Sequence, residues 1–183
     1  MSILNVLLLS AGLAVDASCV ASANGIAYQL SLYSILKVAL FFAVFQAVMP
    51  MVGYGIVQGI GFDISRFTPY IALVILGALG VKMILDGVAN KEAATDAKVL
   101  SIKLILLQSI STSIDALSVG TFLVGLSFVA MIKVVAVIGV TTFLMCILAG
   151  VLGTKIGTKL NNKAEIVGGL VLIFLGIKIF LES

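Results

Sequence analysis

Two aspartates stand inside strongly apolar stretches of this chain. Asp16 occurs in the segment SAGLAVDASCV and Asp115 in the segment SISTSIDALSVG. On membrane-insertion scales a charged residue at the centre of a helix costs about 2.5–3.5 kcal/mol, which a function, a partner or a water-filled cavity has to offset. Carboxylate oxygens are hard ligands that suit Mg²⁺, Ca²⁺ and Mn²⁺. If the fold brings the two side chains together, they predict a divalent-cation site. The alternative is two isolated, protonated carboxyl groups.

Gln46 is a third polar residue in the middle of an apolar run, one helical turn before Pro50. Because proline has no backbone N–H, the carbonyl of Gln46 loses its helical hydrogen bond. The side-chain amide and this carbonyl can both coordinate a cation at the same depth. An interhelical hydrogen bond from the amide is an equally good interpretation, so both stay open.

Six more residues are candidates for an additional site or a gate: Ser111, Thr112, Cys19, Met49, Lys82 and Asp86. For the hydroxyl groups we favour a hydrogen bond to the preceding helical turn over ligation. We expect Met49 to fill space between helices. The two cysteines, Cys19 and Cys146, are expected to be small packing residues and not a disulfide.

Two lysines are followed one turn later by an acid, Lys82 by Asp86 and Lys178 by Glu182. Such pairs near helix ends are typical of long side chains anchored at the membrane interface. Because the pair occurs twice, a gate or a charge partner for the aspartates is the alternative.

The elements that must position these residues are membrane-spanning helices. Of the 183 residues, 62% are hydrophobic and 10% are charged, whereas soluble domains carry about 25% charged residues. A helix needs roughly 20 apolar residues to cross a bilayer. Six runs are long enough: about 3–24, 36–60, 69–88, 101–126, 131–153 and 164–181. We therefore predict an all-α integral membrane protein with six transmembrane helices in a single domain over residues 1–183.

The composition also excludes several classes of function. Histidine is absent, which removes histidine metal sites and histidine general-base catalysis, and we expect no enzymatic activity. The net charge of +3 is small and dispersed, so no surface for nucleic acid is visible.

Proline and glycine predict local features of these helices. Pro50 should kink or break the second helix. The spacings Gly55–Gly59 and Gly153–Gly157 favour faces on which helices pack closely.

Basic residues predict the orientation in the membrane, because they gather in cytoplasmic loops. One set of connections carries Lys37, Lys91, Lys98, Lys103, Lys155, Lys159 and Lys163. The opposite connections carry only Arg66 and Lys133. We therefore expect both termini outside and the charged loop at about residues 89–100 in the cytoplasm.

The two halves of the chain resemble each other. LGVKMILD, from Leu79, matches LGIKIFLE, from Leu175, position by position, and the same spacing relates Lys37 to Lys133. Since each half holds three predicted helices, the second half must enter the membrane upside down. The prediction is an inverted 3+3 repeat, with repeat 1 at about residues 1–90 and repeat 2 at about 101–183. Many secondary transporters have this architecture, with the substrate site where the repeats meet.

Four segments resemble a known family: AGLAVDASCVASANG, FQAVMPMVGYGIVQGIG, SISTSIDALSVG and KAEIVGGLVLIFLGIKI. They are similar to the MntP family of bacterial manganese efflux pumps, in the wider LysE-like exporter group. The resemblance implies a six-helix exporter of Mn²⁺ in the bacterial cytoplasmic membrane, with Asp16 and Asp115 as its intramembrane aspartates. Lys82 and Asp86 match a basic residue and its acidic follower in the third helix. Gln46 stands where the family often has Glu, which leaves ion selectivity and proton coupling open.

The leading hypothesis is export of Mn²⁺ by alternating access, in exchange for protons. Mn²⁺ is then the substrate, no permanent cofactor is expected, and the partners are a divalent ion and the lipid bilayer, with a homo-oligomer left open. One alternative is a LysE-like exporter of a small organic solute such as an amino acid, whose carboxylate only Lys82 could bind. Another is a membrane assembly factor that does not transport.

Overall fold

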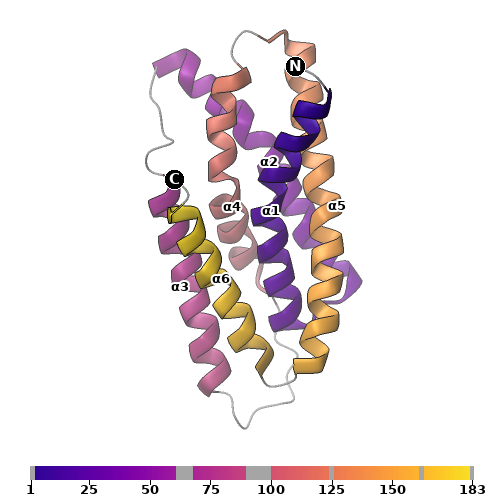
Figure 1. The fold of residues 1–183 in the computed structure, drawn as a ribbon, viewed down its shortest axis with the longest axis vertical. Helices are drawn as coiled ribbons and strands as arrows, with labels where there is room; N and C mark the ends of the chain where they lie inside the picture. The colour runs from indigo at the N-terminus through magenta and orange to yellow at the C-terminus, as the bar shows by residue number, and fades with distance from the viewer. Residues whose placement is uncertain (1–2, 61–67, 90–99, 124–125, 161–162, 182–183) are drawn as a thin grey trace.

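The described part of the chain consists mainly of six α-helices (Figure 1). This computed structural model describes residues 3–60, 68–89, 100–123, 126–160 and 163–181. The helices are α1 (Ile3–Tyr28), α2 (Leu32–Ile60), α3 (Thr68–Ala89), α4 (Ile102–Leu123), α5 (Phe128–Leu160) and α6 (Ala164–Leu181). Six helices at nearly these positions were predicted from the apolar runs, and that part of the prediction is confirmed.

Serine residues mark the start of three of these helices. The hydroxyl of Ser31 accepts a hydrogen bond from the backbone N–H of Ser34 before α2. Ser101 and Ser127 accept in the same way at the starts of α4 and α5. A serine at this position satisfies a backbone donor that the first turn of a helix leaves without a partner. The polar breaks between the apolar runs therefore define where the helices begin.

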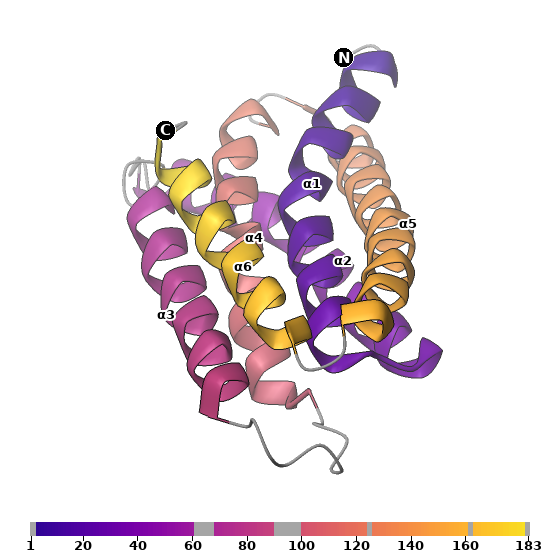
Figure 2. The same cartoon turned by 60° about the horizontal axis from the view of Figure 1, so that its bottom comes forward.

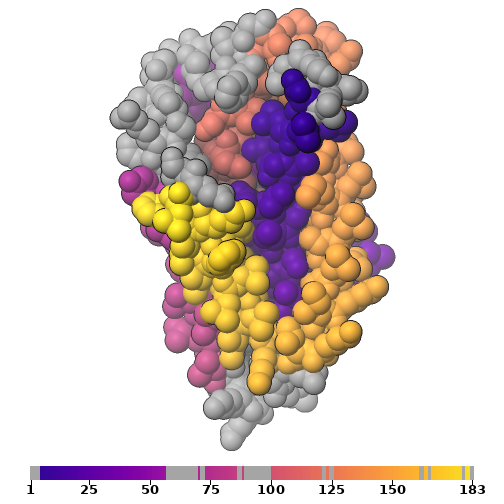
Figure 3. All heavy atoms as spheres, viewed as in Figure 1, coloured from indigo at the N-terminus to yellow at the C-terminus, as the bar shows by residue number. Residues whose placement is uncertain are grey.

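The helices pack in preferred pairs. α1 packs most extensively against α5, α4 against α2, and α3 against α6, while α2 and α5 also contact each other. In Figures 1 and 2, α3 and α6 stand side by side at one flank of the bundle. Figure 3 shows α1 in the seam between α5 and α6 on one face. The helices α1, α2, α4 and α5 therefore form a group, and the α3–α6 pair lies beside it.

Glycines allow the closest of these contacts. A Cβ atom added to Gly153 would collide with the carbonyl oxygen of Ser22, and one added to Gly157 would collide with that of Ile26. The backbones of α1 and α5 therefore touch along this face, which confirms the packing role predicted for Gly153–Gly157. The same prediction is wrong for Gly55, which is exposed and has no atom of the described residues within 4 Å of an added Cβ. The surroundings of Gly59 lie outside those described.

For Pro50 we predicted a kink or a break in the second helix. The helix continues through Pro50, so the break is wrong, and the kink stays a prediction. Pro50 is buried where α2 meets α4: a Cβ added to Gly120 would lie 2.7 Å from its carbonyl oxygen. Gly53 makes the matching contact with the backbone of Leu117. Proline is tolerated inside membrane helices where neighbouring helices pack closely, and α4 packs against α2 at Pro50 and Gly53.

The outer surface suits a lipid environment. Large apolar side chains such as Leu8, Val74, Leu148 and Phe174 are 64–69% exposed, and exposed apolar area on this scale marks a membrane or protein contact. Within the described residues, α1, α2, α4 and α5 contain candidate membrane spans. Shorter apolar stretches run over Leu73–Leu85 in α3 and Ile166–Lys178 in α6. An all-helical protein with several apolar helices is therefore observed.

Candidate metal site

A pair of buried amides fixes α1 against α4. The Asn24 side-chain nitrogen donates to Gln108 Oε1 at 2.7 Å, and the Gln108 side-chain nitrogen donates to Asn24 Oδ1 at 3.0 Å. Both residues are fully buried, so each amide satisfies the hydrogen-bonding groups of the other where bulk water has no access. Reciprocal bonds of this kind set the position of one helix along the other.

The two aspartates lie about two helical turns from this amide pair, Asp16 before Asn24 on α1 and Asp115 after Gln108 on α4. Because α1 and α4 run in opposite directions, these two steps lead to the same level. The charge of Asp16 acts on the Asp115 carboxylate, and both residues are half-buried. Asp115 Oδ1 also accepts a hydrogen bond from the backbone N–H of Ala116 at 2.8 Å. The fold thus places the two acidic residues at one level of the bundle, where the charge of one acts on the other.

Gln46 approaches the same part of α1 from α2. Its side-chain nitrogen donates to the carbonyl oxygen of Leu13 at 3.1 Å, three residues before Asp16. The residue is fully buried, and its Oε1 atom has no hydrogen-bond partner among the described residues. The nitrogen of the amide therefore makes the interhelical bond that the sequence left open. The oxygen of the amide can coordinate a cation.

Most hydroxyl groups near the aspartates bond within their own helix, as we expected. Ser18 donates to the Ala14 carbonyl at 2.6 Å, and Thr112 donates to the Gln108 carbonyl at 2.9 Å. Ser111 differs: it is buried, and its hydroxyl has no partner in the described part of the chain. It precedes Asp115 by one turn, which puts both side chains on one face of α4.

A further buried oxygen belongs to Thr142 on α5, a residue not singled out from the sequence. Thr142 is fully buried, and within the described ranges its hydroxyl oxygen has no hydrogen-bond partner. A sequence signal for it existed, because Thr142 follows Gln46 at the spacing that relates Lys133 to Lys37.

The remaining candidates lie in varied surroundings. Cys19 and Cys146 are free thiols, as predicted, and Cys146 contacts the Ser18 hydroxyl. Met49 packs against an apolar cluster, as a space-filling residue does. Lys82 is exposed, and the side chain of Asp86 lies outside those described.

Lys178 reaches further inward than Lys82. It is half-buried, and its charge and that of Asp16 both act on the Cys19 thiol. Of the two lysines singled out in the sequence, Lys178 is thus the one whose charge reaches a thiol inside the bundle.

Across the described residues, no group of three or more His, Cys, Asp or Glu side chains gathers where it could hold a metal ion. The candidate site therefore consists of two carboxylates with neutral oxygens around them. Such an oxygen-only set suits a hard divalent cation.

A model of the family described as "putative manganese efflux pump" matches residues 29–180. The chain belongs to the MntP family. A curated MntP relative from Ruminiclostridium cellulolyticum is 39% identical, with an alignment that covers 100% of this chain and 97% of the relative. MntP 2 of Clostridium botulinum is 38% identical over 100% of this chain and 96% of its own length. An MntP from Clostridium perfringens is also 38% identical, over 100% of this chain and 95% of its own length. All three are named as putative manganese efflux pumps. No solved structure matches.

Proposed function

We propose that this protein exports Mn²⁺ across the bacterial cytoplasmic membrane, with Asp16 and Asp115 as the central ligands and the Gln46 amide oxygen beside them. The observation that carries the proposal is the Asn24–Gln108 pair, whose bonds fix α1 against α4 at the register where the charge of Asp16 acts on Asp115. The names of the relatives supply the metal. Two carboxylates balance the charge of one dication, so the loaded site is neutral.

Alternating access follows from the inverted 3+3 repeat, which we propose as the architecture of six membrane-spanning helices. The pairing of α1 with α5 and of α4 with α2 supports it, because exchange of the two halves turns one pair into the other. The repeat-related Gly80 and Gly176 add support, since each lies on the α3–α6 contact. A Cβ added to Gly80 would lie 2.6 Å from the carbonyl oxygen of Gly169, and one added to Gly176 would lie 3.3 Å from Leu76 Cβ.

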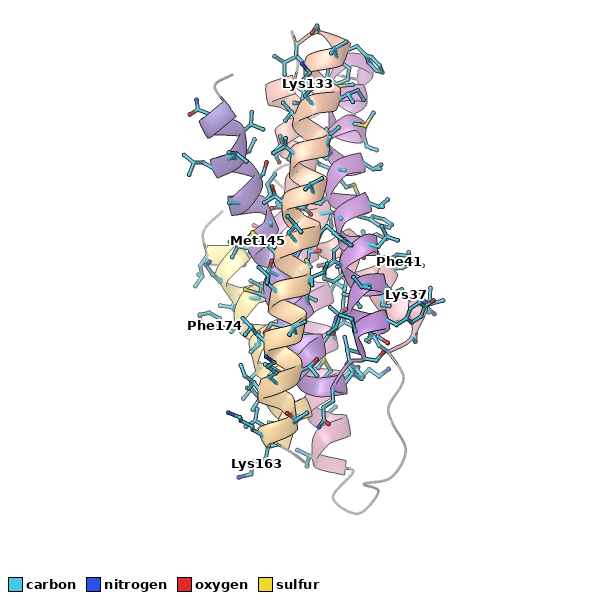
Figure 4. The ribbon with its side chains drawn as sticks, turned by 90° about the vertical axis from the view of Figure 1, so that its right-hand side faces the viewer. Lys37, Phe41, Lys133, Met145, Lys163 and Phe174 are labelled. Atoms are coloured by element: carbon cyan, nitrogen blue, oxygen red, sulfur yellow. The ribbon has the colours of Figure 1, made fainter. Side chains whose placement is uncertain are left out.

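The proposed orientation has both termini outside. Figure 4 supports it, because Lys133 lies at one end of the bundle and Lys37 and Lys163 lie toward the other. Lys155 and Lys159, in the last turns of α5, add to the basic end. An excess of basic residues marks the cytoplasmic side.

Proton exchange is the coupling mode that this ligand set favours. After the cation leaves to the outside, two protons can take its place on the two carboxylates and keep the site neutral. The protonated, neutral site can then return to the cytoplasmic side, where release of the protons restores the ligands.

The test is manganese flux in proteoliposomes together with manganese tolerance of cells that lack their own exporter. Asp16→Asn and Asp115→Asn keep the side-chain size but remove the charge, and each should reduce Mn²⁺ flux by at least about tenfold. Asp96→Asn, in the charged central segment, is the matched control and should keep the flux. Full flux and full tolerance in both site variants would show that the ligand assignment is wrong.

An amino-acid exporter is the second candidate, because the half-buried Lys178 acts on the same thiol, Cys19, as Asp16 does and could bind a substrate carboxylate. Amino-acid flux without Mn²⁺ flux in the same vesicles would favour it. No flux of either substrate would favour an assembly factor that does not transport.

A further inference from the structure

We infer that Thr142 is a neutral oxygen ligand of the transported cation and forms a repeat-related pair with Gln46. The inference rests on the proposed function and adds a residue to its site. It starts from two fully buried side-chain oxygens, Gln46 Oε1 and Thr142 Oγ1, that lack a hydrogen-bond partner within the described residues.

A buried hydroxyl without a partner is unusual, because nearly all buried polar groups are hydrogen-bonded. Threonine in a helix normally has a local solution, a bond to the carbonyl of the preceding turn. Thr112 on α4 makes that bond, at 2.9 Å to Gln108, and the hydroxyl of Thr142 does not. The oxygen of Thr142 is thus available to a group that is not part of α5.

Thr142 lies beside the stretch of α1 that directly precedes Asp16. One turn later on the same buried face of α5, Cys146 contacts Ser18 of α1. Since α1 and α5 run parallel, with Gly153 against Ser22, Thr142 is level with about residues 11–14 of α1. Gln46 donates to the carbonyl of Leu13 in this same stretch.

The contact between α2 and α5 brings Thr142 and Gln46 toward each other. A Cβ added to Gly139, one turn before Thr142, would lie 3.2 Å from Ala47 Cβ and 3.5 Å from the Ala43 carbonyl oxygen. Ala43 and Ala47 flank Gln46 along α2. The backbones of α2 and α5 therefore pass close to each other next to both unpartnered oxygens.

The proposed repeat relates Gln46 to Thr142. In the proposed repeat, α1 corresponds to α4 and α2 to α5, so Asp16 corresponds to Asp115 and Gln46 to Thr142. The site then has a carboxylate from each first helix and a neutral oxygen from each second helix. Neutral oxygens lower the free energy of a hard dication without adding charge, so Thr142 should favour Mn²⁺ over softer metals such as Cd²⁺.

The experiment measures Mn²⁺ and Cd²⁺ flux by the full chain in proteoliposomes. Thr142→Val removes the oxygen at nearly constant volume and should raise the KM for Mn²⁺ about tenfold. Thr142→Ser keeps a hydroxyl and should retain near wild-type KM. Thr142→Cys places sulfur at the same position and should raise Cd²⁺ flux relative to Mn²⁺ flux, a change that a packing role would not produce. Thr141→Val, at the adjacent half-buried threonine, is the control.

The outcomes separate this inference from the proposed function. A raised KM in Thr142→Val, together with a Cd²⁺ preference in Thr142→Cys, supports the ligand role. Unchanged KM and unchanged metal preference in a wild type that transports Mn²⁺ overturn the role of Thr142 alone. If Thr142→Val does not fold, the Thr142→Cys and Thr142→Ser variants decide the matter in the same way. Absence of Mn²⁺ flux in the wild type overturns both proposals.

Discussion

At the scale of single residues, Asp115 is held by its own backbone surroundings. The N–H of Ala116 donates to one carboxylate oxygen, which orients the side chain without a second charged residue. Gln46 is anchored in a comparable way through its nitrogen to Leu13. Both side chains are therefore positioned before any cation arrives, and pre-positioned ligands lose less conformational entropy on binding.

Lys178 offers a test of the electrostatics around this site. Its charge and that of Asp16 both act on the Cys19 thiol, so it should oppose entry of a dication. Lys178→Met should therefore lower the KM for Mn²⁺ by about fivefold, which corresponds to roughly 1 kcal/mol, since a tenfold change is about 1.4 kcal/mol. Lys82→Met, at the repeat-related but exposed position, should leave KM unchanged. Flux titrations in vesicles measure both values, and an equal shift in the two variants would contradict the assignment.

The proposed ligands differ in how far the sequence reveals them. Asp16 and Asp115 are conspicuous because a charge in an apolar run is costly. Thr142 is not, since threonine is common in helices and normally bonds to its own backbone. Its missing partner depends on how α5 packs, which the sequence does not contain. The exposure of Lys82 and the inward position of Lys178 likewise depend on packing, although the two lysines occupy equivalent positions in the sequence.

At the scale of helices, the apolar runs and the serine caps predict where each element lies. They do not predict which face meets a neighbour. The GxxxG spacing occurs at Gly55–Gly59 and at Gly153–Gly157. Gly153 and Gly157 contact α1, whereas Gly55 contacts no neighbouring helix among the described residues. On α2 it is Gly53 that contacts α4. The effect of Pro50 on the course of α2 is also not predicted by the sequence, because it depends on the helix packed beside this residue.

Matched glycine substitutions test this difference between helix faces. Gly153→Ala would push Ser22 and α1 away from α5, so we expect lower stability, by about 1–3 kcal/mol as for other overpacked interiors. Gly55→Ala meets no atom of the described residues within 4 Å, and replacing glycine by alanine inside a helix gains up to about 1 kcal/mol. Unfolding in detergent measures both changes. Similar stability of the two variants would mean that α1 and α5 do not touch at Gly153.

At the scale of the whole molecule, the four helices α1, α2, α4 and α5 supply the proposed ligands and the α3–α6 pair lies to one side. The helix pairings link the two halves of the chain, since α1 packs mainly on α5 and α4 mainly on α2. A cation held by residues from both halves would therefore stabilise the association of the halves as well as its own site.

Mn²⁺ should accordingly raise the stability of the purified protein. A ligand that binds only the folded state, at a concentration of 100 times its Kd, adds about 2.7 kcal/mol to the free energy of unfolding. Mn²⁺ should act in this way because carboxylates from both halves of the chain would bind it. The thermal unfolding midpoint in detergent, measured with increasing Mn²⁺, should rise for the wild type. It should not rise for the double variant Asp16→Asn/Asp115→Asn. If the double variant gains as much stability from Mn²⁺ as the wild type, the ion binds elsewhere, because removal of both charges leaves the Asp16–Asp115 site without the ligands that balance a dication.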